Sequence, residues 1–129
     1  MNSGDLQRLE HIQLYCEDIA QFIERFGRDY STFINDRAYF SAVSMCVLQI
    51  GELANGLSEE FRVQTKSEIP WHKVRAMRNL LAHAYMTTDE SVMWATVTKD
   101  IPALLDFCRK TLDNAKGGDA HEQTARTDG

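Results

Sequence analysis

The chain contains few residues that interrupt helices. Only two prolines and seven glycines occur among 129 residues, and Gly117, Gly118 and Gly129 account for three of those glycines. Proline removes a backbone donor and glycine is costly inside a helix, so their scarcity favours long helices. The length predicts one domain, and an apolar fraction of 43% is sufficient for a core.

Long apolar runs are also missing. The longest stretch without a charge, residues 38–51, is too short to cross a bilayer. Near the N-terminus, Asp5, Arg8 and Glu10 interrupt any stretch that could act as a signal peptide. We therefore expect a soluble, cytoplasmic protein that does not contact a membrane.

Cysteine is scarce, and its placement argues against a metal site. Cys16, Cys46 and Cys108 are odd in number, far apart and at apolar helix positions. This pattern predicts buried free thiols in a reducing compartment. No pair has the spacing of zinc ligands, and the four histidines do not supply it. We predict no metal and no cofactor.

The charge is acidic overall but unevenly distributed. The formal net charge is −5, which argues against bulk affinity for nucleic acid. Residues 61–85 nevertheless carry five cationic side chains against Glu68 alone, so this window is +4 and the remainder is −9. Such a basic region could receive a phosphate or an acidic partner, or it could be ordinary helix-surface charge.

Apolar periodicity predicts an all-α antiparallel bundle of four to five helices. The first helix, at about 4–26, carries a heptad seam formed by Leu9, Ile12, Cys16, Ile19, Ile23 and Phe26. The second, at about 37–57, is apolar nearly all round and should be central, with Asp36 as its cap. Gly51 in its middle suggests close approach of another helix.

The second half of the chain continues this pattern. A short amphipathic helix can begin at Ser58, a third helix is predicted at about 70–84, and a fourth begins near Asp89. Pro102 should kink the fourth helix about one turn earlier, or force a restart at Asp100. Residues 1–115 therefore form the predicted bundle, and residues 116–129, which lack apolar periodicity, form a predicted disordered tail.

Chemically active side chains gather on the third predicted helix. Arg75, Asn79 and His83 are spaced four residues apart, which stacks them within about 80° of one face, and Arg78 lies beside that row. Arginine can clamp a phosphate with two parallel hydrogen bonds, histidine can move a proton near neutral pH, and asparagine can orient the imidazole. Tyr85 should follow the predicted helix end, where its hydroxyl could reach solvent.

Glu52 is the only charge in the central stretch of the second helix. It could face the arginine and histidine cluster, or it could simply lie at the rim of the core. The cluster itself has a structural alternative, in which the histidine caps a helix and the arginines are solvated.

The residues of this cluster resemble those of the HEPN superfamily. Its R-x-x-x-x-H pattern, in the longer form R-N-x-x-x-H-x-Y, is matched by Arg78, Asn79, His83 and Tyr85. That form characterises the HepT-like toxins, which are paired with minimal nucleotidyltransferase antitoxins. Further matching segments, spread over residues 5–115, are Gly51-Glu52, Ile69-Pro70-Trp71 and Asp100-Ile101-Pro102.

The resemblance implies a HEPN-like homodimer, in which these segments of two protomers meet in a cleft and cleave RNA without a metal. Arg78 and His83 would be the catalytic pair, and Asn79 would orient them. From their positions in the sequence, we expect Glu52 and Arg75 to support the site. Tyr85 would accept AMP from the cognate antitoxin, which would silence this toxin of a type VII-like pair. A larger assembly with the antitoxin is compatible with this scheme.

The implied chemistry has a physical requirement. RNA cleavage without a metal needs a base, a stabiliser of the phosphorane charge and an acid. Arg78 can stabilise but cannot be the acid, because its pKa exceeds about 12. One histidine per chain must therefore serve twice, or a dimer must supply two. The rival hypothesis is a nucleotide- or partner-binding helical module that does not cleave RNA.

Overall fold

The structure is a computed structural model. It describes the backbone of residues 1–87 and 90–128, and the side chains of residues 1–80 and 90–117. Over these residues the chain is helical and contains no strand, which confirms the predicted all-α class. None of the described helices combines the length and apolar character that crossing a membrane requires.

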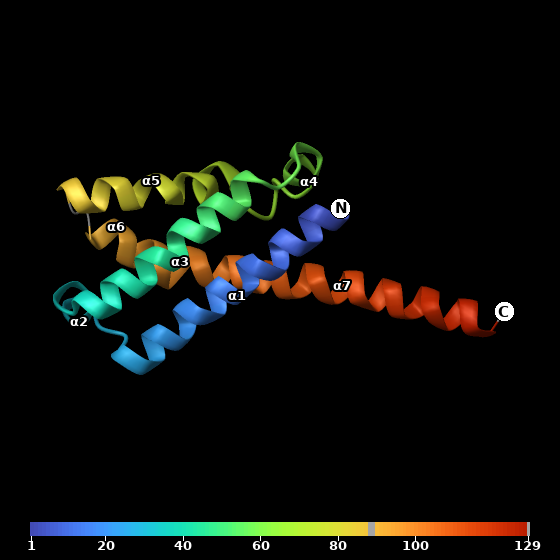
Figure 1. Cartoon of the computed structure of the whole chain (residues 1–129), viewed down its shortest axis with the longest axis horizontal. Helices are drawn as coiled ribbons and strands as arrows, with labels where there is room; N and C mark the ends of the chain where they lie inside the picture. Colours follow the sequence, from blue (N-terminus) through green and yellow to red (C-terminus); the bar gives the residue numbers. More distant parts are fainter. Residues whose placement is uncertain (88–89, 129) are drawn as a thin grey trace.

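Four long helices form the body. They are α1 (Ser3–Phe26), α3 (Arg37–Asn55), α5 (Trp71–Thr87) and α7 (Ile101–Asp128). In Figure 1, α3 crosses between α1 and α5, and each of these helices runs antiparallel to the next along the chain. The last helix α7 packs against α1, and α3 packs against both α1 and α5.

The first helix forms as its heptad pattern predicts. Asn2 caps it, and Leu9, Ile12, Cys16 and Ile19 are completely buried along its inner face. The three cysteines are buried free thiols, as expected. Burial raises the pKa of Cys46 to about 11 and that of Cys108 to about 12, so both thiols stay protonated at neutral pH.

The central helix α3 is capped by Asp36, whose carboxylate accepts from the backbone N–H groups of Ala38 and Tyr39. It ends at Asn55, two residues before the predicted end. It is not covered on every side, because Met45 is 54% exposed. The contacts of α3 with α1 and α5 agree with the prediction of a central helix.

Short helices join the long ones. Helix α4 (Glu59–Gln64) begins at its cap Ser58, as predicted. Helix α2 (Tyr30–Asn35) lies between the first and second predicted helices, where no helix was predicted. Its six residues are too few to show a periodicity, but Asp29 caps it and Phe33 anchors it in the core.

The interruption before Pro102 takes the form of a π-helical turn. Helix α6 (Glu90–Ala95) leads into η1 (Thr96–Asp100), and α7 follows directly at Ile101. The Ile101 N–H donates to the Thr96 carbonyl, five residues earlier. Pro102 has no N–H to offer Thr98, so the wider turn accommodates the missing bond without a break.

Two predicted boundaries fall at the edge of the described residues. Helix α5 extends to Thr87, so Tyr85 lies within the helix and not after its end. The predicted tail, 116–129, begins inside the bounds of α7, and the side chains from 118 onward lie outside the described residues. The division at residue 115 stays a prediction.

Candidate active site

The candidate site lies where α5 crosses α3. Gly51 permits this crossing, because a Cβ atom built on it would stand only 2.6 Å from the backbone nitrogen of Arg78 and 3.1 Å from its Cβ. No side chain fits at such a distance, so glycine lets the two backbones touch. The predicted close approach at Gly51 is confirmed, and the helix that approaches is the one that carries Arg78.

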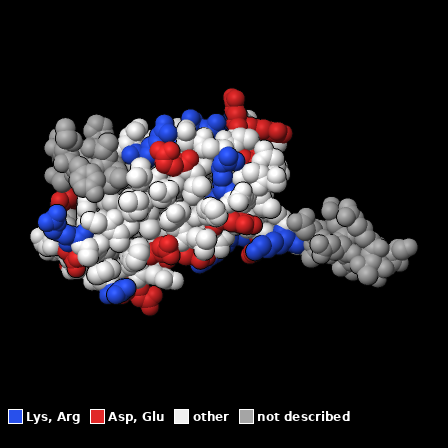
Figure 2. All heavy atoms as spheres, viewed as in Figure 1, with Lys and Arg blue, Asp and Glu red and all other residues white. Residues whose placement is uncertain are grey.

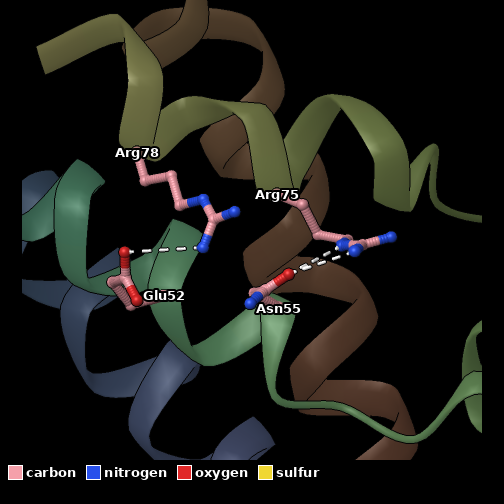
Figure 3. Close-up of polar contacts among 4 residues, drawn as sticks. All are labelled: Glu52, Asn55, Arg75 and Arg78. Atoms are coloured by element: carbon pink, nitrogen blue, oxygen red, sulfur yellow. Dashed lines mark hydrogen bonds and ion pairs between the residues drawn. The ribbon is translucent and has the colours of Figure 1, made fainter. Parts of the chain in front are cut away.

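The next residue of α3 faces the same arginine. A Glu52 carboxylate oxygen lies 3.8 Å from Nη1 of Arg78, and the two side chains are 53% and 38% exposed. Figure 3 shows both side chains pointing toward one another from their helices. At this distance and exposure the pair is a weak tether. Glu52 can therefore orient the guanidinium while leaving its other donors free for a phosphate.

Arg75 is held more firmly, one turn earlier on α5. Its Nε and Nη2 donate to the same oxygen of Asn55, at 3.2 and 3.1 Å. Asn55 is neutral, so Arg75 keeps its full positive charge. The sequence offered a signal for this partner that was not used: Asn55 lies three residues after Glu52, on the same stripe of α3.

The helix α5 is also tied to the π-helical turn. Lys73 Nζ lies 3.2 Å from a carboxylate oxygen of Asp100. The aspartate that precedes Ile101-Pro102 therefore forms an ion pair that links α5 to η1.

The remaining predicted site residues are only partly placed. Asn79 is exposed on α5, next to Arg78 in the chain. His83 and Tyr85 belong to α5 by its bounds, but their side chains lie outside the described residues. The structure thus brings together Arg78, Glu52 and Arg75, and the contribution of His83 and Tyr85 stays a prediction.

The described part of the site can bind an anion. Arg75 and Arg78 project from one helix, and Glu52 forms the weak ion pair with Arg78. Among residues 1–80 and 90–117, no group of three or more His, Cys, Asp and Glu side chains could hold a metal ion.

Comparison with known proteins points in the same direction as this geometry. The family described as "Ribonuclease HepT-like" matches residues 12–111. A Thermococcus cleftensis protein named "Probable ribonuclease HepT" is 38% identical over 95 residues, which cover 70% of this chain and 86% of that protein.

Two further relatives cover similar shares. A Caldanaerobacter subterraneus protein named a "Putative RNase" is 31% identical over 108 residues, covering 84% of this chain and 94% of its own. A Methanocaldococcus jannaschii protein, also named a "Putative RNase", is 32% identical over 96 residues, covering 74% of this chain and 80% of its own. No solved structure gives a significant match.

Proposed function

The chain belongs to the HepT-like ribonuclease family, and on that basis we propose that it is a toxin endoribonuclease that cleaves RNA without a metal ion. The family match covers the helices that form the candidate site. The structural observation that carries the proposal is the Arg78 guanidinium, held beside Gly51 and Glu52 with part of its surface open to solvent.

In the proposed mechanism Arg78 binds the scissile phosphate. Its planar fork can stabilise the negative charge that develops on the phosphorane oxygens. His83 removes the proton from the 2′-hydroxyl, and a histidine then protonates the leaving 5′-oxygen, so the products are a 2′,3′-cyclic phosphate and a free 5′-hydroxyl. Asn79 orients the pair. Two protomers supply the two histidines, one as base and one as acid.

We further propose that the protein is controlled by a partner nucleotidyltransferase antitoxin that attaches AMP to Tyr85. Tyr85 is two residues from His83 on α5. A nucleotide attached there would add negative charge near Arg78 and compete with the RNA phosphate.

The experiment that tests the activity uses the full chain, labelled RNA and excess EDTA. We expect wild-type protein to cleave RNA in EDTA and His83→Ala to lose cleavage while keeping its thermal unfolding midpoint. His72→Ala is the matched control, because His72 is an exposed residue at the opposite end of the same helix. A folded wild-type protein that binds RNA without cutting it would instead support the non-catalytic module.

A further inference from the structure

A second group of basic side chains surrounds a hollow beyond Arg75. The hollow has a volume of about 240 Å³ and is lined by residues of α4, the following turn and α5: Glu59, Arg62, Val63, Lys66, Trp71 and Arg75. Three cations against one carboxylate give its lining a net charge of +2. Figure 2 shows Lys and Arg atoms gathering along the edge where α5 runs toward α4.

Arg62 is the least satisfied member of this group. Its Nε and Nη1 atoms are buried and have no hydrogen-bond partner among the described residues. Covered guanidinium N–H groups without an acceptor are costly, and arginines in folded proteins are normally paired. Glu59 lines the same hollow, yet no ion pair joins it to Arg62 among the described side chains. A small adjustment of Arg62 toward the hollow would let it meet an anion.

Hydrogen bonds hold the other elements that line the hollow in place. The Trp71 indole N–H donates to the Thr65 hydroxyl at 2.8 Å, and that hydroxyl donates to the Phe61 carbonyl at 2.8 Å. Trp71 is only 4% exposed. These bonds hold the turn after α4 against the start of α5, so the cations stand on a rigid frame.

The hollow lies next to the candidate active site along α5. Arg75 belongs to both places: it lines the hollow, and it lies three residues before Arg78, about 4.5 Å along the helix axis. Figure 3 shows Arg75 and Arg78 projecting from α5 on the same side. The hollow and His83 therefore lie in opposite directions along α5 from Arg78, as two points on one extended strand would.

We propose that this hollow is a second phosphate subsite, which binds a backbone phosphate of the RNA strand away from the bond that is cut. This inference rests on the proposed function, because it takes RNA as the ligand. Arg62, Lys66 and Arg75 supply the donors, and Glu59 weakens the site. The contact is to phosphate, so it raises affinity for every sequence alike.

The test measures binding and cleavage separately. For binding, the probes are labelled single-stranded oligoribonucleotides with a 2′-deoxy sugar at the cleavage position and one neutral methylphosphonate linkage, moved along the strand. We expect one neutral linkage away from the cleavage position to weaken binding to wild-type protein. Lys66→Gln should remove that effect. It should also reduce the magnitude of the slope of log K against log salt concentration by about 0.7 to 1.

Matched variants distinguish RNA binding in the hollow from a general effect of positive charge on RNA affinity. Lys66 and Lys99 are both exposed, but Lys99 lies on η1 and does not line the hollow, so Lys99→Gln should bind RNA as wild type does. Glu59→Gln should bind more tightly. Arg62→Lys keeps the charge but loses the fork, and it should weaken binding. If Arg62 variants fail to fold, the exposed Lys66 still decides the question.

In cleavage, Lys66→Gln should raise KM and leave kcat unchanged, because it removes uniform binding. If RNA is cut and Lys66→Gln matches Lys99→Gln in both assays, the subsite is wrong and the proposed function stands. If RNA is bound through the hollow but never cut, the subsite stands and the proposed function is wrong. If no methylphosphonate position matters, the hollow does not bind RNA phosphate.

Discussion

At the scale of single residues, the site depends on a contrast between two arginines of one helix. Arg75 is fixed by two hydrogen bonds to the neutral Asn55, whereas Arg78 is only tethered to Glu52 at 3.8 Å. A fixed cation contributes a steady field, and a loosely held one can rearrange around a phosphate as charge develops. This difference assigns the two side chains different roles in spite of their identical chemistry.

Replacing Arg78 with lysine tests the role of the planar fork. The charge is retained but the bidentate geometry is lost, so we expect kcat/KM to fall by on the order of 10², as for loss of one donor to a developing oxyanion. The unfolding midpoint should stay within a few degrees of wild type, because Arg78 is 38% exposed and weakly paired. A variant that unfolds at room temperature would show that Arg78 is structural.

Replacing Tyr85 with phenylalanine tests the proposed regulation. The aromatic ring is kept and the acceptor hydroxyl is lost, so the variant should retain at least part of its RNA cleavage and escape silencing by the nucleotidyltransferase. Intact-mass measurement after co-expression should show an AMP increment on wild-type chain only. If Tyr85→Phe showed the same mass increment, the modified residue would not be Tyr85.

At the scale of helices, one glycine controls the distance between α3 and α5. In Gly51→Ala the new Cβ would stand 2.6 Å from the Arg78 nitrogen, so the two helices must separate. Higher helix propensity would favour alanine by about 1 kcal/mol, but the overlap should outweigh it and destabilise the fold by about 1–3 kcal/mol. Cleavage should fall too, because Arg78 moves away from Glu52.

The control for this substitution is Gly117→Ala. Gly117 lies in α7 with nothing within 4 Å of a built Cβ, so alanine should leave stability unchanged or slightly increased. Urea unfolding and initial cleavage rates measure both effects. Equal stability of the two variants would mean that the α3–α5 approach can relax without cost.

The buried carboxylate of Asp5 joins α1 to Ser58, the cap residue of α4. Asp5 is 1% exposed and accepts the Ser58 N–H at 2.8 Å and the Ser58 hydroxyl at 2.6 Å. Burial alone would raise the pKa of Asp5, but hydrogen bonds from Ser58 and from the Asn2 backbone, together with the positive N-terminus, outweigh it and lower the pKa below the usual value of 3.8. The ionised form is therefore the one that the fold stabilises.

The lowered pKa of Asp5 predicts that the stability of the fold depends on pH. A lowered pKa in the folded state means that the stabilisation is present above the unfolded pKa, near pH 4, and is lost as pH falls through the folded value. Asp5→Asn should cost about 1–3 kcal/mol at pH 7, and the difference from wild type should shrink below pH 4. Urea unfolding at several pH values measures it, with the exposed Asp113→Asn as control. If the difference in unfolding free energy between wild type and Asp5→Asn grew as the pH fell, the pKa of Asp5 would be raised in the folded state and not lowered.

At the scale of the whole molecule, the proposed mechanism assigns one histidine per chain, His83, to a reaction that needs both a base and an acid. We therefore expect a C2 dimer whose α5 segments meet near the two-fold axis. Light scattering at micromolar concentration should give about twice the chain mass of 14.7 kDa. Cleavage per chain should fall on dilution below the dimer dissociation constant. Full activity of a monomer would exclude the composite site.

The sequence by itself determined the helical class, the inner face of α1, the caps at Asp36 and Ser58 and the place of the interruption near Pro102. Each of these depends on residues close together in the chain, where helical periodicity and hydrogen-bond capacity act directly. The candidate pair Arg78 and His83 was predicted from the spacing of a short motif, which resembles the R-x-x-x-x-H pattern of the HEPN superfamily. The six residues of α2 escaped prediction, although Asp29 is a cap signal of the same kind as Ser58 at the equally short α4.

Only the tertiary structure decided which side chains meet. Arg75 with Asn55, Lys73 with Asp100 and Asp5 with Ser58 are pairs that lie 20 to 53 residues apart, and no local pattern specifies them. The structure also places Glu52 opposite Arg78, with its side chain 53% exposed, and its part in the site stays a prediction. Burial and the crossing of helices depend on the whole packed core, and therefore the hollow around Arg62 also became visible only in three dimensions.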